Sequence, residues 1–298
     1  MNIVIAGGSG LIGTALTGAL RARGDQVIHL VRRAAAAPDE VSWDPAAGRL
    51  DPGSLAGADA VISLGGASVG RLPWTPRYRD ELWRSRIDAT RTIVLALHSL
   101  PARGRAVPAL LSASASGYYG SEPGKPLTEQ SAVGNTFLAR LCAAWEAEAL
   151  RASDVTGVAL LRTSPILHPQ GVLRPMIRLT RLGLGGPLGN GRQVWPWISL
   201  ADEVGAILHI LDRRITGPVN LAGPGAATNA EIGRELAHAL HRPFWLPAPA
   251  FALRPALSRD ATDSLLLADA NVVPTVLTRT GYEFRHPTAR EAIRASIS

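Results

Sequence analysis

Cysteine and lysine are the rarest residues in this 298-residue chain, which has one of each. Both low counts exclude some classes of function. The one cysteine, Cys142, excludes an internal disulfide and any metal cluster held by several thiolates. The one lysine is Lys125, so 30 of the 31 basic residues counted as Lys or Arg are arginine. These arginines are scattered among acidic residues, and the formal net charge of +7 therefore does not predict nucleic-acid binding.

Long apolar runs are also missing. No stretch approaches the length of a membrane span, and the apolar start is interrupted by glycines and lacks a basic region. We therefore expect no membrane association, no signal peptide and a cytoplasmic location. Apart from His238-Ala-Leu-His241, the seven histidines are scattered along the chain, and we expect no metal site.

The first turn of the chain carries the strongest positive signal. An apolar strand at 2–6 runs into Gly7-Gly-Ser-Gly10-Leu-Ile-Gly13, before a helix at 11–23 and a second strand at 26–31. Glycines at this spacing allow a tight turn, close approach of a phosphate and close packing of helix on strand. The alternative is a tight turn with no ligand. We predict that a dinucleotide pyrophosphate binds here, at Gly7, Gly10, Leu11, Ile12 and Gly13.

The end of the second strand lacks the acidic residue that binds the ribose 2′-hydroxyl of NAD. It reads Leu30-Val31-Arg32-Arg33, and the first acid is Asp39. Two guanidinium groups attract a 2′-phosphate that a carboxylate would repel. We therefore predict NADP(H) as the cofactor, bound by Arg32 and Arg33. The alternative is that both are solvated loop charges.

Alternation of strands and helices predicts an α/β fold, a Rossmann-type doubly wound parallel sheet with a smaller, mixed C-terminal substrate lobe. Further strands are expected at 41–43, 59–64, 109–112 and 155–161, helices at 76–99 and 135–151, and a loop at 114–120. We expect a nucleotide-binding domain over 1–165, to which 201–225 returns. The substrate lobe takes 166–200 and 226–298, including a C-terminal module from about residue 245.

The glycine motif, the order of elements and Ser112-Ala-Ser114-Ala-Ser-Gly-Tyr118-Tyr119-Gly120 together resemble the extended short-chain dehydrogenase/reductase superfamily. The match is closer to its atypical "epimerase family" branch, which carries a small C-terminal domain of unknown function. Motifs typical of that branch include Ser85-Arg-Ile-Asp-x-Thr-Arg91, Gly183-Leu-Gly-Gly-Pro-Leu-Gly189 and Gly281-Tyr-x-Phe284. The resemblance covers essentially the whole chain and implies the fold and NADP(H) binding, but the branch has no settled substrate.

The same resemblance implies further cofactor contacts. Leu64 and Gly65 at the end of the fourth strand are expected to pass the adenine-side ribose, and Pro165 follows the strand end beside the nicotinamide. Glu81 and Arg86, on the long helix, are expected to point towards the cofactor. The alternative for these two is a solvated helix face.

The superfamily's catalytic pair, a tyrosine with a lysine four residues later, cannot form in this chain. The corresponding helix reads Phe137-Leu-Ala-Arg140-Leu141-Cys142, and Lys125 lies in a loop. As substitutes we predict Ser114, donating a hydrogen bond to a carbonyl oxygen, and Tyr118 or Tyr119 as the acid. The alternative is that Ser114 bonds backbone at the strand end and one tyrosine packs in the core.

The expected substrate-side loop carries Trp195 where an arginine of nucleotide-sugar enzymes binds the diphosphate, which argues against such a substrate. Trp195 and Trp197 either form an apolar wall over the substrate or pack inside the lobe. We predict an oxidoreductase or epimerase that acts on an unidentified small molecule. The alternative is an NADP(H)-sensing protein without turnover, and the sequence leaves a homodimer open.

Overall fold

Seven parallel strands form a single sheet in the order β3-β2-β1-β4-β5-β7-β8. This computed structural model describes residues 1–100, 106–251, 255 and 258–297. The strands are β1 (Asn2–Ala6), β2 (Gln26–Val31), β3 (Glu40–Ser42), β4 (Ala60–Ser63), β5 (Ala109–Ala115), β7 (Val158–Thr163) and β8 (Gly217–Leu221). The strand order reverses between β1 and β4, and ligands of doubly wound folds bind at this point beyond the carboxyl ends of the strands.

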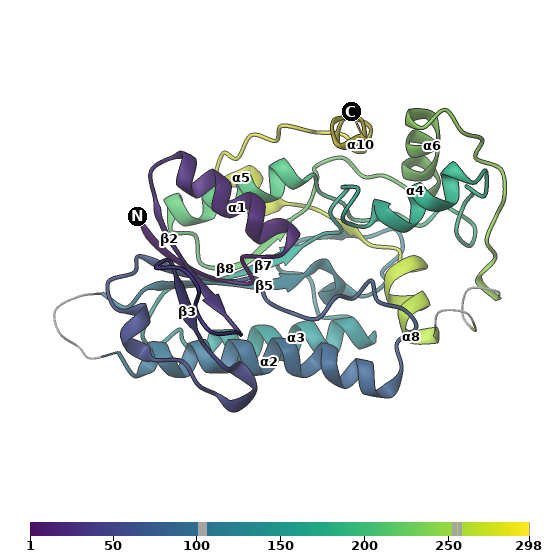
Figure 1. The fold of residues 1–298 in the computed structure, drawn as a ribbon. Helices are drawn as coiled ribbons and strands as arrows, with labels where there is room; N and C mark the ends of the chain where they lie inside the picture. The colour runs from purple at the N-terminus through teal and green to yellow at the C-terminus, as the bar shows by residue number, and fades with distance from the viewer. Residues whose placement is uncertain (101–105, 252–254, 256–257, 298) are drawn as a thin grey trace.

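Helices cover both faces of the sheet, with α1 and α5 on one side and α2 and α3 on the other (Figure 1). The helices are α1 (Leu11–Ala22), α2 (Pro76–His98), α3 (Phe137–Leu150), α4 (Leu173–Arg181), α5 (Leu200–Arg213), α6 (Asn229–Ala239), α8 (Arg259–Ala261), α9 (Thr275–Arg279) and α10 (Ala289–Ile297). Ile3 and Ile5 join the apolar core beneath α1 and α5, whereas Val4 and Ala6 join the core beneath α2 and α3. The α/β, doubly wound prediction is confirmed, because both faces of the parallel sheet are apolar and covered.

A smaller lobe lies beside the carboxyl ends of the strands, where α4, α6 and α10 pack together (Figure 1). A two-stranded parallel ladder between β6 (Pro126–Leu127) and β9 (Asn271–Val272) ties its last part to the loop after β5. Thr228 and Glu231 form a complete capping box at the start of α6, since the side chain of each accepts from the backbone of the other.

The structure corrects two local predictions and contains one helix that was not predicted. Ser114 lies within β5 rather than in a loop, because the strand continues to Ala115 alongside β7. The strand predicted at 155–161 begins only at Val158 and runs to Thr163. Helix α4 was not predicted, and it tolerates Pro175 because a proline in the first turn removes no helical hydrogen bond.

Candidate cofactor and reaction site

The turn between β1 and α1 contains two glycines that the fold itself requires. Gly7 has a φ of +88°, and a Cβ there would lie 2.9 Å from the backbone nitrogen of Gly65. A Cβ at Gly13 would lie 2.3 Å from the carbonyl oxygen of Gly7. Leu64 and Gly65, immediately after β4, thus form one wall of this turn. Leu11 and Ile12 are partly buried and pack against the core beneath α1.

Gly10 is different, because nothing in the protein requires a glycine at this position. It is the N-cap residue of α1 with a φ of −77°, and an added Cβ would meet only the Gly7 carbonyl oxygen, at 3.4 Å. No side chain caps the helix, so its first N–H groups keep their hydrogen-bonding capacity. Chain neighbours aside, no other atom of the described residues would lie within 4 Å of this Cβ, at the positive end of α1.

Two arginines follow β2 at the carboxyl edge of the sheet, beside a cavity also lined by Ser42, Trp43 and Arg49. Arg33 makes a bidentate pair with Glu40, at 2.5 and 2.8 Å, and this hydrogen bonding lowers the pKa of Glu40 to about 2. Arg32 is exposed and makes no hydrogen bond or ion pair with any described residue. The two predicted phosphate ligands therefore differ, since the charge of Arg33 is already offset and that of Arg32 is not.

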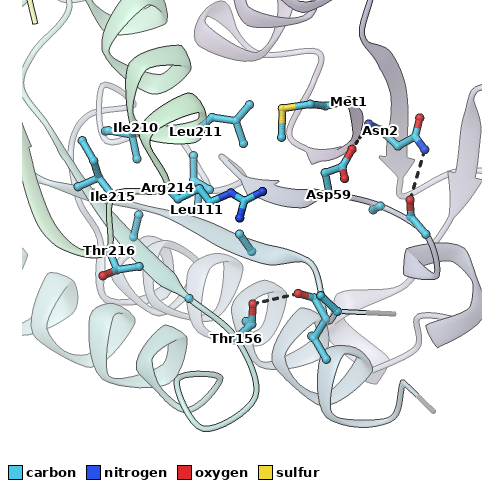
Figure 2. Close-up of a pocket in the computed structure, with 17 residues that line it drawn as sticks. Met1, Asn2, Asp59, Leu111, Thr156, Ile210, Leu211, Arg214, Ile215 and Thr216 are labelled. Carbon is cyan, nitrogen blue, oxygen red and sulfur yellow. Dashed lines mark hydrogen bonds between the residues drawn. The ribbon is translucent and has the colours of Figure 1, made fainter. Parts of the chain in front are cut away.

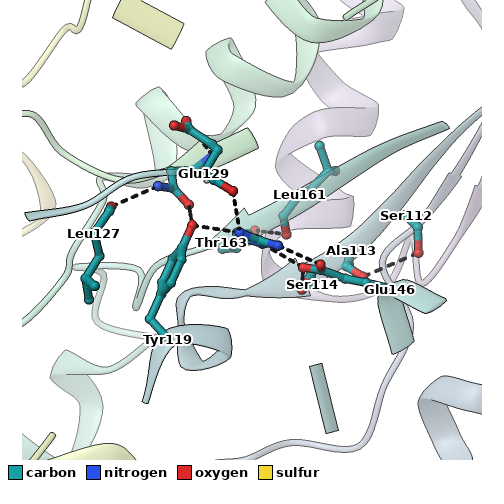
Figure 3. A network of polar contacts seen from close by, with 11 residues as sticks. Ser112, Ala113, Ser114, Tyr119, Leu127, Glu129, Glu146, Leu161 and Thr163 are labelled. Carbon is teal, nitrogen blue, oxygen red and sulfur yellow. Dashed lines mark hydrogen bonds and ion pairs between the residues drawn. The ribbon is translucent and has the colours of Figure 1, made fainter. Parts of the chain in front are cut away.

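Ser114 belongs to a buried polar network behind the carboxyl end of β5 (Figure 3). Its hydroxyl donates to Glu146 Oε1 at 2.7 Å, and Arg162 donates to both carboxylate oxygens of Glu146 at 2.8 Å. A carboxylate only accepts hydrogen bonds, so the hydroxyl proton of Ser114 is committed to Glu146. In this geometry Ser114 presents lone pairs, and not a proton, to anything bound beside it.

The two neighbouring tyrosines lie in different environments. Tyr119 is completely buried; its hydroxyl donates to Asn220 Oδ1 at 2.6 Å and accepts from Arg162 at 2.9 Å. Burial raises the pKa of Tyr119 to about 12 although Arg162 acts in the opposite sense. Tyr118 is partly buried, its ring centroid lies 3.6 Å from Cζ of Arg162, and its hydroxyl bonds no described residue. Of the two, Tyr118 keeps a hydroxyl available to a ligand.

Sequence reasoning missed the centre of this network, the Glu146–Arg162 pair. Both side chains are at least nine-tenths buried. Burial alone would lower the pKa of Arg162, but the hydrogen bonds and charge of Glu146 outweigh that effect and raise it. An arginine inside the apolar strand Val158–Thr163 was the one direct sequence signal of a buried ion pair.

The other predicted contacts are spread along the same edge of the sheet. Glu81 is exposed on α2, and Pro165 is exposed after β7. Arg86 is partly buried, and it donates to the carbonyl oxygens of Leu82 at 2.9 Å and Ala67 at 3.1 Å. Its guanidinium also lies 5.2 Å from the ring centroid of Trp145. An exposed Glu81 leaves both alternatives open, whereas the partly buried Arg86 is not on a solvated face.

The two tryptophans of the expected substrate loop lie inside the lobe. Trp195 and Trp197 are 7% and 2% exposed. Their indole N–H groups donate to the carbonyl oxygens of Leu266 and Gly225, respectively. Both rings belong to the apolar core of α4, α6 and α10. The packing alternative is correct here, since these rings stabilise the lobe and do not form an exposed apolar wall.

A separate cavity of about 520 Å³ lies at the opposite edge of the sheet, among the amino ends of the strands (Figure 2). Asn2, Asp59, Thr156 and Arg214 contribute its polar lining. It is remote from the carboxyl ends where the glycine turn and the Ser114 network lie. Within the described ranges, no cluster of three or more His, Cys, Asp or Glu side chains suits a metal ion, and no helix is long and apolar enough to cross a membrane.

Comparison with known proteins identifies the family. Residues 3–222 match the model of the NAD dependent epimerase/dehydratase family, and residues 248–296 match a domain of unknown function. The chain belongs to the NAD dependent epimerase/dehydratase family. An epimerase family protein of Mycobacterium tuberculosis is 41% identical, over 98% of this chain and 96% of the relative. The human epimerase family protein SDR39U1 is 30% identical, over the full length of both chains.

Solved structures of known proteins have the same fold. The crystal structure of human SDR39U1 with NADPH has a TM-score of 0.88 and 30% identity, and the match covers 100% of this chain and 99% of that one. UDP-glucose 4-epimerase of Thermus thermophilus, in complex with NAD, has a TM-score of 0.76 at 18% identity and covers 100% and 98% of the two chains. At 18% identity the second likeness shows the fold alone. The resemblance to an atypical extended short-chain dehydrogenase/reductase is thus confirmed.

Proposed function

We propose that this chain binds NADP(H) in preference to NAD(H) and uses it to reduce a small carbonyl compound. The observation that carries the cofactor preference is the exposed, unpaired Arg32 at the end of β2, where an NAD site needs a carboxylate. The presence of NADPH in the structure of human SDR39U1, at 30% identity over the whole chain, supports the same choice.

In this proposal the pyrophosphate lies against Gly7, Gly10, Leu11, Ile12 and Gly13, and the open position at Gly10 is where it comes closest. The N–H groups of the first turn of α1 donate to it. Leu64, Gly65 and Pro165 line its path along the strand ends, with Glu81 at the rim. The 2′-phosphate meets Arg32 directly, and Arg33 contributes less because Glu40 already holds it.

Tyr118 is the proposed acid, because its hydroxyl is the uncommitted one of the pair. Bound NADPH supplies a hydride to the carbonyl carbon and is oxidised to NADP⁺. Tyr118 gives a proton to the former carbonyl oxygen and regains one from solvent. Carbonyl reduction needs a proton donor, whereas alcohol oxidation needs the base that the superfamily's tyrosine–lysine pair supplies and this chain lacks, so reduction is favoured. Ser114 orients the substrate by accepting a hydrogen bond from it. Tyr119 packs against Tyr118, with the two ring centroids 5.4 Å apart.

A second candidate is an NADP(H)-sensing protein that does not turn over substrate. One observation favours it: the hydroxyl protons of Ser114 and Tyr119 are both used inside the protein. The two candidates share the cofactor and differ in chemistry.

Two measurements test the proposal in sequence. Titration with NADPH and NADH, followed by quenching of tryptophan fluorescence, should give a Kd at least tenfold lower for NADPH. Equal affinities would refute the cofactor preference. NADPH consumption is then followed over a panel of aldehydes, ketones and quinones. Tight NADPH binding without consumption over this panel would favour the sensing protein.

A further inference from the structure

Arg86 is unusual among the arginines of the described chain, because it is shielded from solvent without a carboxylate beside it. Three described arginines are not exposed: Arg79, Arg86 and Arg162. Arg79 pairs with Asp260, and Arg162 pairs with Glu146. Arg86 has only the carbonyl oxygens of Leu82 and Ala67, and no acid among the described residues faces it. Burial lowers the pKa of its guanidinium, which reflects the cost of holding this charge away from water.

The position of Arg86 places this charge at the carboxyl edge of the sheet. Its side chain rises from α2 beneath the loop that follows β4, so close that a Cβ at Gly66 would lie 3.0 Å from the guanidinium carbon. On its other side lie Trp145 and Cys142 of α3. Burial raises the pKa of the Cys142 thiol to about 12, against the opposing effect of the Arg86 charge. Trp145, whose ring Arg86 faces, is followed on α3 by Glu146, which accepts the hydrogen bond of Ser114.

A partly buried cation without an anion is costly unless a ligand supplies the negative charge. Two guanidinium hydrogen bonds to carbonyl oxygens leave further N–H donors free to bind an oxyanion. The phosphates of NADP(H) already have partners in the proposed function. The pyrophosphate lies at the amino end of α1, and the 2′-phosphate lies at Arg32.

We infer that Arg86 binds a negatively charged group of the substrate, so that the substrate is a small carbonyl compound that carries a carboxylate. This inference rests on the proposed function and extends it from a reaction type to a substrate class. It revises the expectation that Arg86 contacts the cofactor. In this inference the Arg86 guanidinium binds the substrate, which lies next to Ser114.

Binding to the NADP⁺ complex tests the inference with compounds that differ in charge and little in shape. Glyoxylate, pyruvate and phenylglyoxylate are each compared with their methyl ester by calorimetry. At least one acid should bind the wild-type complex tenfold or more tightly than its ester, the lower end expected for a charge-assisted contact. Arg86→Met should abolish this difference and leave the Kd of NADPH within twofold. Arg86→Lys, which keeps the charge, should retain part of it.

Arg84→Met is the matched control, since Arg84 lies on the same helix, is exposed and pairs with Asp80. Arg84→Met should change neither the difference in affinity between acid and ester nor the Kd of NADPH. Thermal unfolding of the ligand-free protein adds a second readout: Arg86→Met should not lower Tm, because it removes an uncompensated charge, whereas loss of a structural contact would lower it.

Three results would overturn the inference. Equal binding of every acid and its ester would show that no substrate anion is recognised. A loss of NADPH affinity in Arg86→Met as large as in Arg32→Ala would assign the cation to a cofactor phosphate. If Arg86→Met and Arg86→Lys both lower Tm but leave the difference in affinity between acid and ester unchanged, the role of Arg86 is structural. Failure of the wild type to bind NADPH at all would instead refute the proposed function, and the first titration detects this separately.

Discussion

The unequal environments of Arg32 and Arg33 lead to a prediction in which two substitutions change cofactor affinity in opposite directions. Arg32→Ala removes the guanidinium that no carboxylate offsets. A hydrogen bond to a charged group contributes about 1.5–3 kcal/mol, and about 1.4 kcal/mol corresponds to a factor of ten. The Kd of NADPH should therefore rise by roughly ten- to a hundredfold, whereas the Kd of NADH, which has no 2′-phosphate, should stay within twofold.

Glu40→Gln should have the opposite effect. The Glu40 carboxylate holds Arg33 through two hydrogen bonds, and Arg33 in turn lowers the pKa of Glu40 to about 2. Glu40 is therefore ionised at every working pH, and replacing it with an amide frees the charge of Arg33 for the phosphate. The affinity for NADPH should increase and that for NADH should not. Because the Arg33 side chain is exposed, the gain should shrink as salt is raised.

Fluorescence titration with NADPH and NADH measures both effects, and 2′,5′-ADP against 5′-AMP isolates the phosphate. The assignment of the 2′-phosphate to this edge is wrong if Arg32→Ala binds NADPH as the wild type does. It is also wrong if either variant changes the affinities for NADPH and NADH equally, since that would report a general change of the β2–β3 loop.

Further predictions concern the glycine turn, the tyrosines and a buried acid. Gly10→Val should fold, as judged by circular dichroism, and lose NADPH binding, because the added side chain meets only one protein atom and fills the space of the phosphate; normal binding would place the phosphate elsewhere. If turnover is found, Tyr118→Phe should abolish it, whereas Tyr119→Phe should mainly lower Tm, because two buried partners lose their hydrogen bond; the reverse pattern in kinetics and thermal unfolding would exchange their roles. Burial raises the pKa of Glu203 to about 8, so between about pH 4.5 and 8 the unfolded chain releases a proton that the folded chain keeps, and stability falls as pH rises. Glu203→Gln should therefore raise Tm more at pH 8 than at pH 5, and an equal change at both would contradict this pKa.

Local sequence was sufficient for the elements that position the cofactor. The glycine spacing and the strand–helix alternation are patterns of neighbours along the chain, and the structure contains both of them. The end of β5 was not predictable in this way. Ser114 and Ala115 look like loop residues, but the ladder with Arg162 and Thr163 of β7 holds them in a strand. Such pairing depends on a segment almost 50 residues away and overrides local propensity.

Side-chain partners across elements explain why the candidate reaction site was only partly predictable. On α2, the positions three and four residues from Arg79 and from Arg86 carry no acid, so helical spacing describes both arginines alike. The fold then separates them: Asp260 of α8 reaches Arg79, whereas Arg86 meets carbonyl oxygens and an indole ring. A sequence pattern identifies where a charge stands along a helix, but only the packing of distant elements shows whether that charge is neutralised. The functional argument for Arg86 therefore depends on the fold, and it begins from a partner that the described chain does not supply.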